Sequence, residues 1–269
     1  MSEHSKQDAD DALGVKLPAF RLDGKVALVT GASAGLGAAI AIGMAQAGAQ
    51  VAIIARTREG LERVAERIRA DGGRCTVIAC DVTDSAALRD GIAGLPRLDI
   101  LVNNAGTNFP EPIVEVSDEH LDVMLALNVK SVYVAAQAAV RKMLEDPRRG
   151  EAGGVILNMS SQMGHVGSPN RTLYCMTKHA VEGFTKALAV ELAPQGIRVN
   201  SIAPTFVDTP LVRRVVNTPE KREFIMNRIP MGRLAGLEDI VAAAVYLASG
   251  AASMVTGTSL VVDGGWTAQ

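Results

Sequence analysis

An α/β fold is predicted by two features of the chain, its composition and the alternation of its segments. Hydrophobic residues make up 48% of the sequence but aromatic residues only 3%. The core must therefore consist mainly of Ala, Val, Ile and Leu, which is typical of parallel strands buried between helices. Short β-branched runs alternate with longer Ala-rich stretches, which implies right-handed crossovers and a doubly wound parallel sheet with helices on both faces. A chain of 269 residues can form this as a single domain.

Seven strands and six helices account for the alternation. The expected strands are VALVT (26–30), VAIIA (51–55), CTVIAC (75–80), DILVN (99–103), GVILNMS (154–160), IRVNSIA (197–203) and SLVVD (259–263). The expected helices cover residues 35–47, 58–71, 84–94, 117–144, 173–193 and 237–249, with Asp84 and Ser117 as N-caps. The resulting seven-stranded sheet is Rossmann-like, so ligands should bind beyond the carboxyl ends of its strands.

Two segments depart from this regular pattern. Residues 1–21 are polar and acidic at their start and read as a flexible tail, which leaves 22–269 as the folded domain. Residues 204–233 contain no strand and carry four prolines. Long inserts at the ligand-binding edge are usually lids or binding loops, so we expect residues 205–235 to contact substrate.

Charge and cysteine usage exclude several function classes. The net charge of −2 gives no whole-molecule attraction to nucleic acid or to anionic membranes. The three cysteines, Cys75, Cys80 and Cys175, are an odd number without metal-ligand spacing. They indicate a reducing, cytoplasmic setting and predict neither a disulfide framework nor a metal site.

One apolar stretch, residues 38–55, has the length of a membrane span. Gln46, Gly48 and Gln50 interrupt it, and its second half is β-branched. A buried helix that leads into a buried strand explains it better than a transmembrane segment.

A glycine-rich turn lies between the first strand and the first helix. Glycines at such a turn let the backbone approach a pyrophosphate, and the helix N-terminus offers free N–H groups. The turn predicts a dinucleotide site that is formed by Gly31, Ser33, Ala34, Gly35, Leu36 and Gly37. Its Gly-x-x-x-Gly-x-Gly spacing differs from the usual fingerprint, so the turn alone is weak evidence.

The end of the second strand predicts which dinucleotide binds. A carboxylate there would accept hydrogen bonds from the 2′-hydroxyl of NAD(H). This chain has Ala55 and Arg56 instead. A guanidinium can pair with a 2′-phosphate, so NADP(H) is preferred and NAD(H) remains possible.

Two further strand ends reach the same edge of the sheet. Asp81 and Val82 follow the third strand, and Asn104, Ala105 and Gly106 follow the fourth. Asp81 could accept from an adenine amino group, while the small residues allow a ribose to approach the backbone. Read alone, both could be ordinary turns, because Asp, Asn and Gly favour turns.

Ser161, Tyr174 and Lys178 carry the predicted chemistry. Ser161 follows the fifth strand, and the i, i+4 spacing of Tyr174 and Lys178 puts both side chains on one helix face. A tyrosine titrates near pH 10, about three units above neutrality, and a nearby cation lowers that value. Ser161 could then hold a substrate oxygen.

Together these segments resemble the short-chain dehydrogenase/reductase family from Leu22 to Trp266. The resemblance implies that Tyr174 is the general acid/base, that Ser161 orients the carbonyl, and that Lys178 binds the nicotinamide ribose and lowers the pKa of the tyrosine. It also implies that Asn128 anchors a water in the proton relay. The family's loop after the sixth strand adds the cofactor contacts Pro204, Thr205, Val207 and Thr209. Thr205 stands where the family usually has glycine, so its side chain is expected to narrow the nicotinamide crevice.

The expected function is NADP(H)-dependent hydride transfer between a nicotinamide and a ketone or secondary alcohol. The chain resembles both sugar-acid or polyol dehydrogenases and 3-oxoacyl-(ACP or CoA) reductases, which share the catalytic residues. Gln195, where carrier-protein reductases often have a basic residue, favours a small carbonyl, polyol or sugar acid. An NADP-binding regulator without turnover is the alternative from another class.

The resemblance also implies a homotetramer. The family pairs the helices that correspond to 117–144 and 173–193, and Ala180, Ala187 and Ala189 would permit close packing.

Overall fold

A computed structural model describes residues 18–146, 153–209, 212–213, 216 and 218–269. Seven parallel strands form one sheet in the order β3-β2-β1-β4-β5-β6-β7. The strands are β1 (Val26–Thr30), β2 (Gln50–Ala55), β3 (Cys75–Ala79), β4 (Ile100–Asn103), β5 (Gly154–Met159), β6 (Ile197–Pro204) and β7 (Ser259–Val262). The order reverses between β1 and β4, which is where a doubly wound sheet opens a crevice for ligands.

The expected helices are present, with ends that agree to within two residues. The longer helices are α2 (Gly35–Gln46), α3 (Arg58–Ala70), α4 (Ser85–Ala93), α5 (Asp118–Leu125), α6 (Ser131–Leu144), α8 (Thr172–Leu192), α10 (Pro219–Met226) and α11 (Leu237–Ala248). Both expected caps are confirmed: Asp84 accepts hydrogen bonds from the first turn of α4, and Ser117 accepts one from the first turn of α5.

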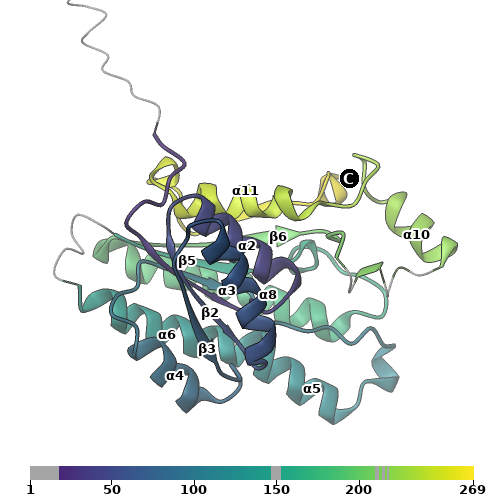
Figure 1. The fold of residues 1–269 in the computed structure, drawn as a ribbon. Helices are drawn as coiled ribbons and strands as arrows, with labels where there is room; N and C mark the ends of the chain where they lie inside the picture. Colours follow the sequence, from purple (N-terminus) through teal and green to yellow (C-terminus); the bar gives the residue numbers. More distant parts are fainter. Residues whose placement is uncertain (1–17, 147–152, 210–211, 214–215, 217) are drawn as a thin grey trace, which may run out of the picture.

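Helices cover both faces of the sheet (Figure 1). Val29 of β1 packs in one core cluster with residues of α2, α3 and α11. Its neighbour Leu28 packs in the other cluster, with residues of α4, α6 and α8. Successive side chains of a strand point to opposite faces, so this division explains why the strands are apolar at nearly every position.

The helix expected over residues 117–144 is interrupted. A π-helical turn, η2 (Ala126–Lys130), separates α5 from α6 and contains Asn128. Such turns are rare in helices and occur often at functional sites. Periodicity cannot reveal a turn of this kind, because the apolar pattern continues through it.

Helix α10 was not predicted. It lies within residues 204–233, where the prolines suggested a continuous loop. Pro219 occupies the first turn, where its missing N–H is harmless, and Thr218 caps the helix by accepting from the Lys221 N–H at 3.3 Å. Pro210 lies outside the described residues.

Neither apolar stretch needs a membrane to explain it. Residues 38–55 divide between α2 and β2, as expected from the sequence. Within the described part of the chain, the helical stretch Asp118–Leu144 is long and apolar enough to cross a bilayer. Six of its buried residues, among them Ala135 and Ala139, belong to the core cluster on one face of the sheet.

Most of the expected N-terminal tail lies outside the described residues. Its described end contacts the domain, because the ring of Phe20 lies 6.0 Å from that of Tyr246 on α11. Whether residues 1–21 form a tail thus stays a prediction.

Candidate active site

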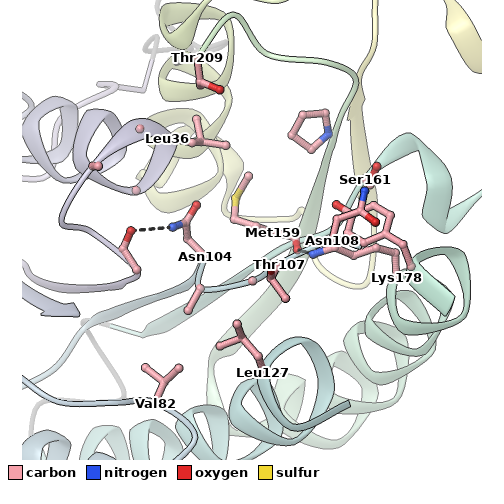
Figure 2. A pocket seen from close by; sticks show the side chains of 18 of the residues that line it. Leu36, Val82, Asn104, Thr107, Asn108, Leu127, Met159, Ser161, Lys178 and Thr209 are labelled. Atoms are coloured by element: carbon pink, nitrogen blue, oxygen red, sulfur yellow. Dashed lines mark hydrogen bonds between the residues drawn. The ribbon is translucent and has the colours of Figure 1, made fainter. Parts of the chain in front are cut away.

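An open cavity of about 1060 Å³ lies over the carboxyl ends of the strands. It is lined by every candidate site residue except Asn128, which is buried beside it. Figure 2 shows Asn108, Ser161 and Lys178 grouped at one end, well apart from Leu36 and Val82. We call the part of the cavity around Leu36 and Val82 the cofactor half, and the part around Asn108 and Ser161 the substrate half.

The glycine turn is fixed to the loop after β4. Asn104 donates from Nδ2 to the carbonyl of Thr30 at 2.9 Å, and Thr30 Oγ1 accepts from the Asn104 N–H at 3.0 Å. A Cβ on Gly37 would collide with Asn104 Nδ2 and with the carbonyl of Gly31. The turn therefore needs glycine at Gly37 for close packing.

Gly35 has a different role in this turn. Its φ is +57°, a conformation that favours glycine, and a Cβ there would point into open space. No side chain caps the N-terminus of α2 beside it. The turn thus leaves room and N–H groups for an anion.

Arg56 and Asp81 lie at the mouth of the cofactor half. Arg56 is exposed, and Asp81 accepts from the N–H and the hydroxyl of Thr83 at 2.9 and 2.8 Å. These hydrogen bonds lower the pKa of Asp81, with a smaller contribution from the charge of Arg56. The carboxylate is therefore ionised and held in one orientation.

Ser161, Tyr174 and Lys178 meet in the substrate half. Lys178 is buried; its Nζ lies 5.5 Å from the centre of the Tyr174 ring and donates to the carbonyl of Met159 at 2.7 Å. Ser161 donates to Gln162 Oε1 at 2.8 Å and accepts from the Met163 N–H at 3.2 Å. The i, i+4 spacing on α8 thus brings phenol and ammonium together beside the serine.

Burial dominates the titration of Tyr174 and Lys178. It raises the pKa of Tyr174 to about 12, while Ser161 and, more weakly, Arg171 lower it. It also lowers the pKa of Lys178 to about 8, against the charge of Glu182. Tyr174 therefore keeps its proton at neutral pH. The expected lowering of its pKa by Lys178 stays a prediction.

Asn128 holds the loop that follows Gly106. Its Oδ1 accepts from the Thr107 N–H, and its Nδ2 donates to the Thr107 carbonyl, both at 2.9 Å. Nδ2 also lies 3.2 Å from Thr177 Oγ1. The side chain thus clamps the loop to α8, and the expected water in a proton relay stays a prediction.

Four polar side-chain atoms are buried without a partner among the described residues, namely Asn108 Oδ1, Ser160 Oγ, Arg171 Nε and Thr205 Oγ1. All four residues line the cavity. A Cβ on Gly164 would lie 2.7 Å from Ser160 Oγ, so this hydroxyl packs against the chain. The others are open to a ligand, because unpaired buried polar atoms are costly.

Sequence reasoning missed Asn108 and Arg171. Arg171 precedes Tyr174 by three residues, a helical spacing that could have singled it out. Asn108 lies only two residues beyond Gly106 but had no motif to mark it.

His165 and Cys175 do not line the cavity. His165 Nε2 lies 2.9 Å from Ser259 Oγ and 3.4 Å from the buried carboxylate of Glu182. The three cysteines are unpaired, and among the described residues no group of three or more His, Cys, Asp or Glu could hold a metal ion.

Comparisons with known proteins identify the family. A family model described as enoyl-(acyl carrier protein) reductase matches residues 31–267. D-threitol dehydrogenase of Mycolicibacterium smegmatis is 43% identical over 252 residues, which cover 92% of this chain and 95% of the relative. L-xylulose reductase of Bos taurus is 39% identical over 249 residues, covering 93% and 99%.

A solved structure agrees with these relatives. The crystal structure of a gluconate 5-dehydrogenase from Burkholderia cenocepacia J2315, in complex with NADP and tartrate, has a TM-score of 0.88 and 35% identity, covering 94% of this chain and 99% of that one. The fold, the site and these matches show that the chain belongs to the short-chain dehydrogenase/reductase family, as an NAD(P)-dependent oxidoreductase that acts on CH–OH groups.

Proposed function

We propose that this protein is an NADP(H)-dependent oxidoreductase that interconverts a ketone and a secondary alcohol in a polyol or sugar acid. The observation that carries the proposal is one continuous cavity, with Arg56 at its cofactor half and Ser161, Tyr174 and Lys178 at its substrate half. The names of the relatives, a threitol dehydrogenase and a xylulose reductase, support the substrate class. The gluconate 5-dehydrogenase with bound NADP supports the cofactor.

The residues of the cavity fit an NADP(H) molecule. The uncapped start of α2 and the open space at Gly35 suit a pyrophosphate, and the exposed guanidinium of Arg56 suits a 2′-phosphate. Asp81, Val82, Ala105 and Gly106 would line the adenosine portion.

At the nicotinamide end of the cofactor, the unpaired Thr205 Oγ1 could form a hydrogen bond with the carboxamide. Pro204, Val207 and Thr209 line the cavity beside it. The hydroxyl of Thr205 thus offers this carboxamide a hydrogen-bond partner, whereas the family's usual glycine has no side chain to do so.

Each catalytic side chain has a distinct task in the reduction. When bound, NADPH would supply a hydride for the carbonyl carbon of the substrate. Ser161 donates a hydrogen bond to the carbonyl oxygen, and Tyr174 supplies the proton. Its pKa of about 12 means that the proton is present at neutral pH. Lys178 would hold the ribose and stabilise the phenolate that forms.

A 3-oxoacyl thioester reductase is the second candidate for this site. It shares the catalytic residues, and the description of the matching family model refers to an acyl-carrier substrate. The unpaired polar atoms of Asn108 and Arg171 in the substrate half favour a polar substrate over an acyl chain.

Exposed apolar side chains support self-association. Tyr133 on α6 and Met176 and Val190 on α8 are 55%, 50% and 79% exposed, on the two helices expected to pair in a tetramer. Ala180 and Ala187 are exposed as well, but Ala189 is 2% exposed and packs in its own core, so its expected place at an interface is wrong. Sedimentation at micromolar concentration would test for the tetramer.

A substrate panel tests the proposal. Oxidation of NADPH and of NADH would be followed with 5-keto-D-gluconate, L-xylulose and acetoacetyl-CoA. We expect turnover of at least one sugar ketone and a higher kcat/KM with NADPH. Turnover of acetoacetyl-CoA alone would mean that the substrate is a 3-oxoacyl thioester and not a sugar ketone. NADPH binding without any turnover would favour a regulator.

A further inference from the structure

Arg171 places a positive charge in the substrate half. Arg171 immediately precedes α8 and is half-buried. It lines the same cavity as Tyr174 and Ser161. One guanidinium nitrogen, Nη1, donates to the Asn170 carbonyl at 3.0 Å, whereas the buried Nε has no partner. The side chain is therefore only partly satisfied by the protein.

No carboxylate neutralises this guanidinium among the described residues. Eight arginines of the described chain form ion pairs with carboxylates, but Arg171 is not among them. Burial lowers the pKa of Arg171, yet an arginine remains charged in proteins. A charge that has lost part of its water and has no counter-ion is unfavourable, and an anionic ligand would relieve it.

Apart from Asp81 in the cofactor half, the acidic residue that lines the cavity among the described residues is Asp122 on α5. It is exposed and forms no ion pair with Arg171. Water screens an exposed charge far more than a half-buried one, so the positive charge dominates within the cavity.

Asn108 supplies an uncharged partner in the same region. Its Oδ1 is buried and unpaired, and its side chain lines the same cavity as Ser161 and Lys178, at the same end of the view in Figure 2. An amide oxygen accepts a hydrogen bond and donates none, so it suits a hydroxyl group. The cavity thus offers one site for an anion and one for a hydroxyl beside the residues proposed to reduce a carbonyl.

We propose that Arg171 binds a carboxylate of the substrate, so that this enzyme prefers hydroxy acids and keto acids of the sugar series to neutral polyols. This inference rests on the proposed function and names the substrate class more narrowly. The carboxylate would receive hydrogen bonds from the guanidinium, and Asn108 would accept from a hydroxyl of the same molecule.

Matched ligands test the inference without turnover. Gluconate and D-glucitol differ only at one end, which is a carboxylate in the first and a hydroxymethyl group in the second. Neither can react with NADPH, because neither carries a ketone that could accept the hydride. Their binding to the enzyme with NADPH would be measured by calorimetry for the wild type, Arg171→Met and Arg171→Lys. Arg63→Met serves as control, because Arg63 is exposed on α3 and does not line the cavity.

We expect gluconate to bind the wild type and the control about tenfold to a hundredfold more tightly than D-glucitol, the range of a charge-assisted hydrogen bond. Arg171→Met should abolish this preference, and Arg171→Lys should keep part of it. Equal binding of both ligands to the wild type, or an unchanged preference in Arg171→Met with NADPH binding intact, would overturn the inference.

Turnover distinguishes this inference from the proposed function. 5-keto-D-gluconate and L-sorbose form the matching pair of ketones. Arg171→Met should raise KM for the keto acid about tenfold to a hundredfold with little change for L-sorbose. An equal fall of kcat for both ketones, with a shifted pH profile, would mean that Arg171 acts only through the pKa of Tyr174. If neither ketone were reduced, the proposed substrate class would fail, while the binding result would still decide the role of Arg171.

Discussion

The two halves of the cavity are built in different ways. The cofactor half follows directly from the sheet: Gly31 to Gly37, Arg56, Asp81 and the Asn104 loop all come just after strands whose pairing is fixed. The substrate half is assembled from the Asn108 loop, α5 and the start of α8. Main-chain pairing of the strands positions the cofactor half, whereas side-chain packing between distant segments positions the substrate half. Substitutions should therefore separate binding of the cofactor from chemistry on the substrate.

The largest effect is expected for Tyr174→Phe. The variant removes the proton donor but few contacts, so kcat should fall at least about a hundredfold while NADPH affinity changes little. Steady-state kinetics and fluorescence titration with NADPH would measure the two effects. Near-normal turnover would remove Tyr174 from the mechanism.

Lys178 should connect the two halves. Lys178→Ala is expected to lower both kcat and NADPH affinity, since the ammonium would stabilise the phenolate of Tyr174 and bind the ribose. Burial lowers the pKa of Lys178 to about 8, so the cation is present below that pH and is lost above it. NADPH affinity of the wild type should fall as pH rises through about 8, and the variant should lack this step. An effect confined to substrate KM would contradict the double role.

Arg56 should act on the cofactor half alone. A charge-assisted contact of about 1.5–3 kcal/mol corresponds to roughly tenfold to a hundredfold preference for NADPH over NADH. Exchanging Ala55 for Asp and Arg56 for a neutral residue should invert the ratio of the two kcat/KM values, with substrate KM unchanged. If the wild type used NADH equally well, the interpretation of Arg56 would be wrong.

The smallest catalytic effect is expected for Asn128→Ala. The substitution leaves the N–H and carbonyl of Thr107 without their partners, which should lower the free energy of unfolding by about 1–3 kcal/mol. Turnover should fall less than in Tyr174→Phe, because the clamp acts through the loop. Denaturant unfolding would measure the stability. An unchanged stability with abolished turnover would instead favour a direct part in proton transfer.

The sequence was informative where main-chain geometry decides the structure. Strand ends and helix caps such as Asp84 could be predicted because they depend on local patterns. The start of α10 has a local signal that was overlooked, an N-capping Thr218 followed by Pro219 in the first turn. The π-helical turn at Asn128 depends on how the helices pack, which periodicity does not encode. The same holds for Arg171, whose unpaired Nε is visible only once the loop and α8 are in place.

Transfer of a labelled hydride tests whether this enzyme reduces a sugar ketone with Tyr174 as proton donor. NADPH that carries deuterium at the transferred position of C4 would be incubated with 5-keto-D-gluconate, and the product would be analysed by mass spectrometry. We expect one deuterium on the newly formed carbinol carbon with the wild type and almost no product with Tyr174→Phe. Product without deuterium, or labelled product formed equally well by Tyr174→Phe, would contradict hydride transfer completed by this tyrosine.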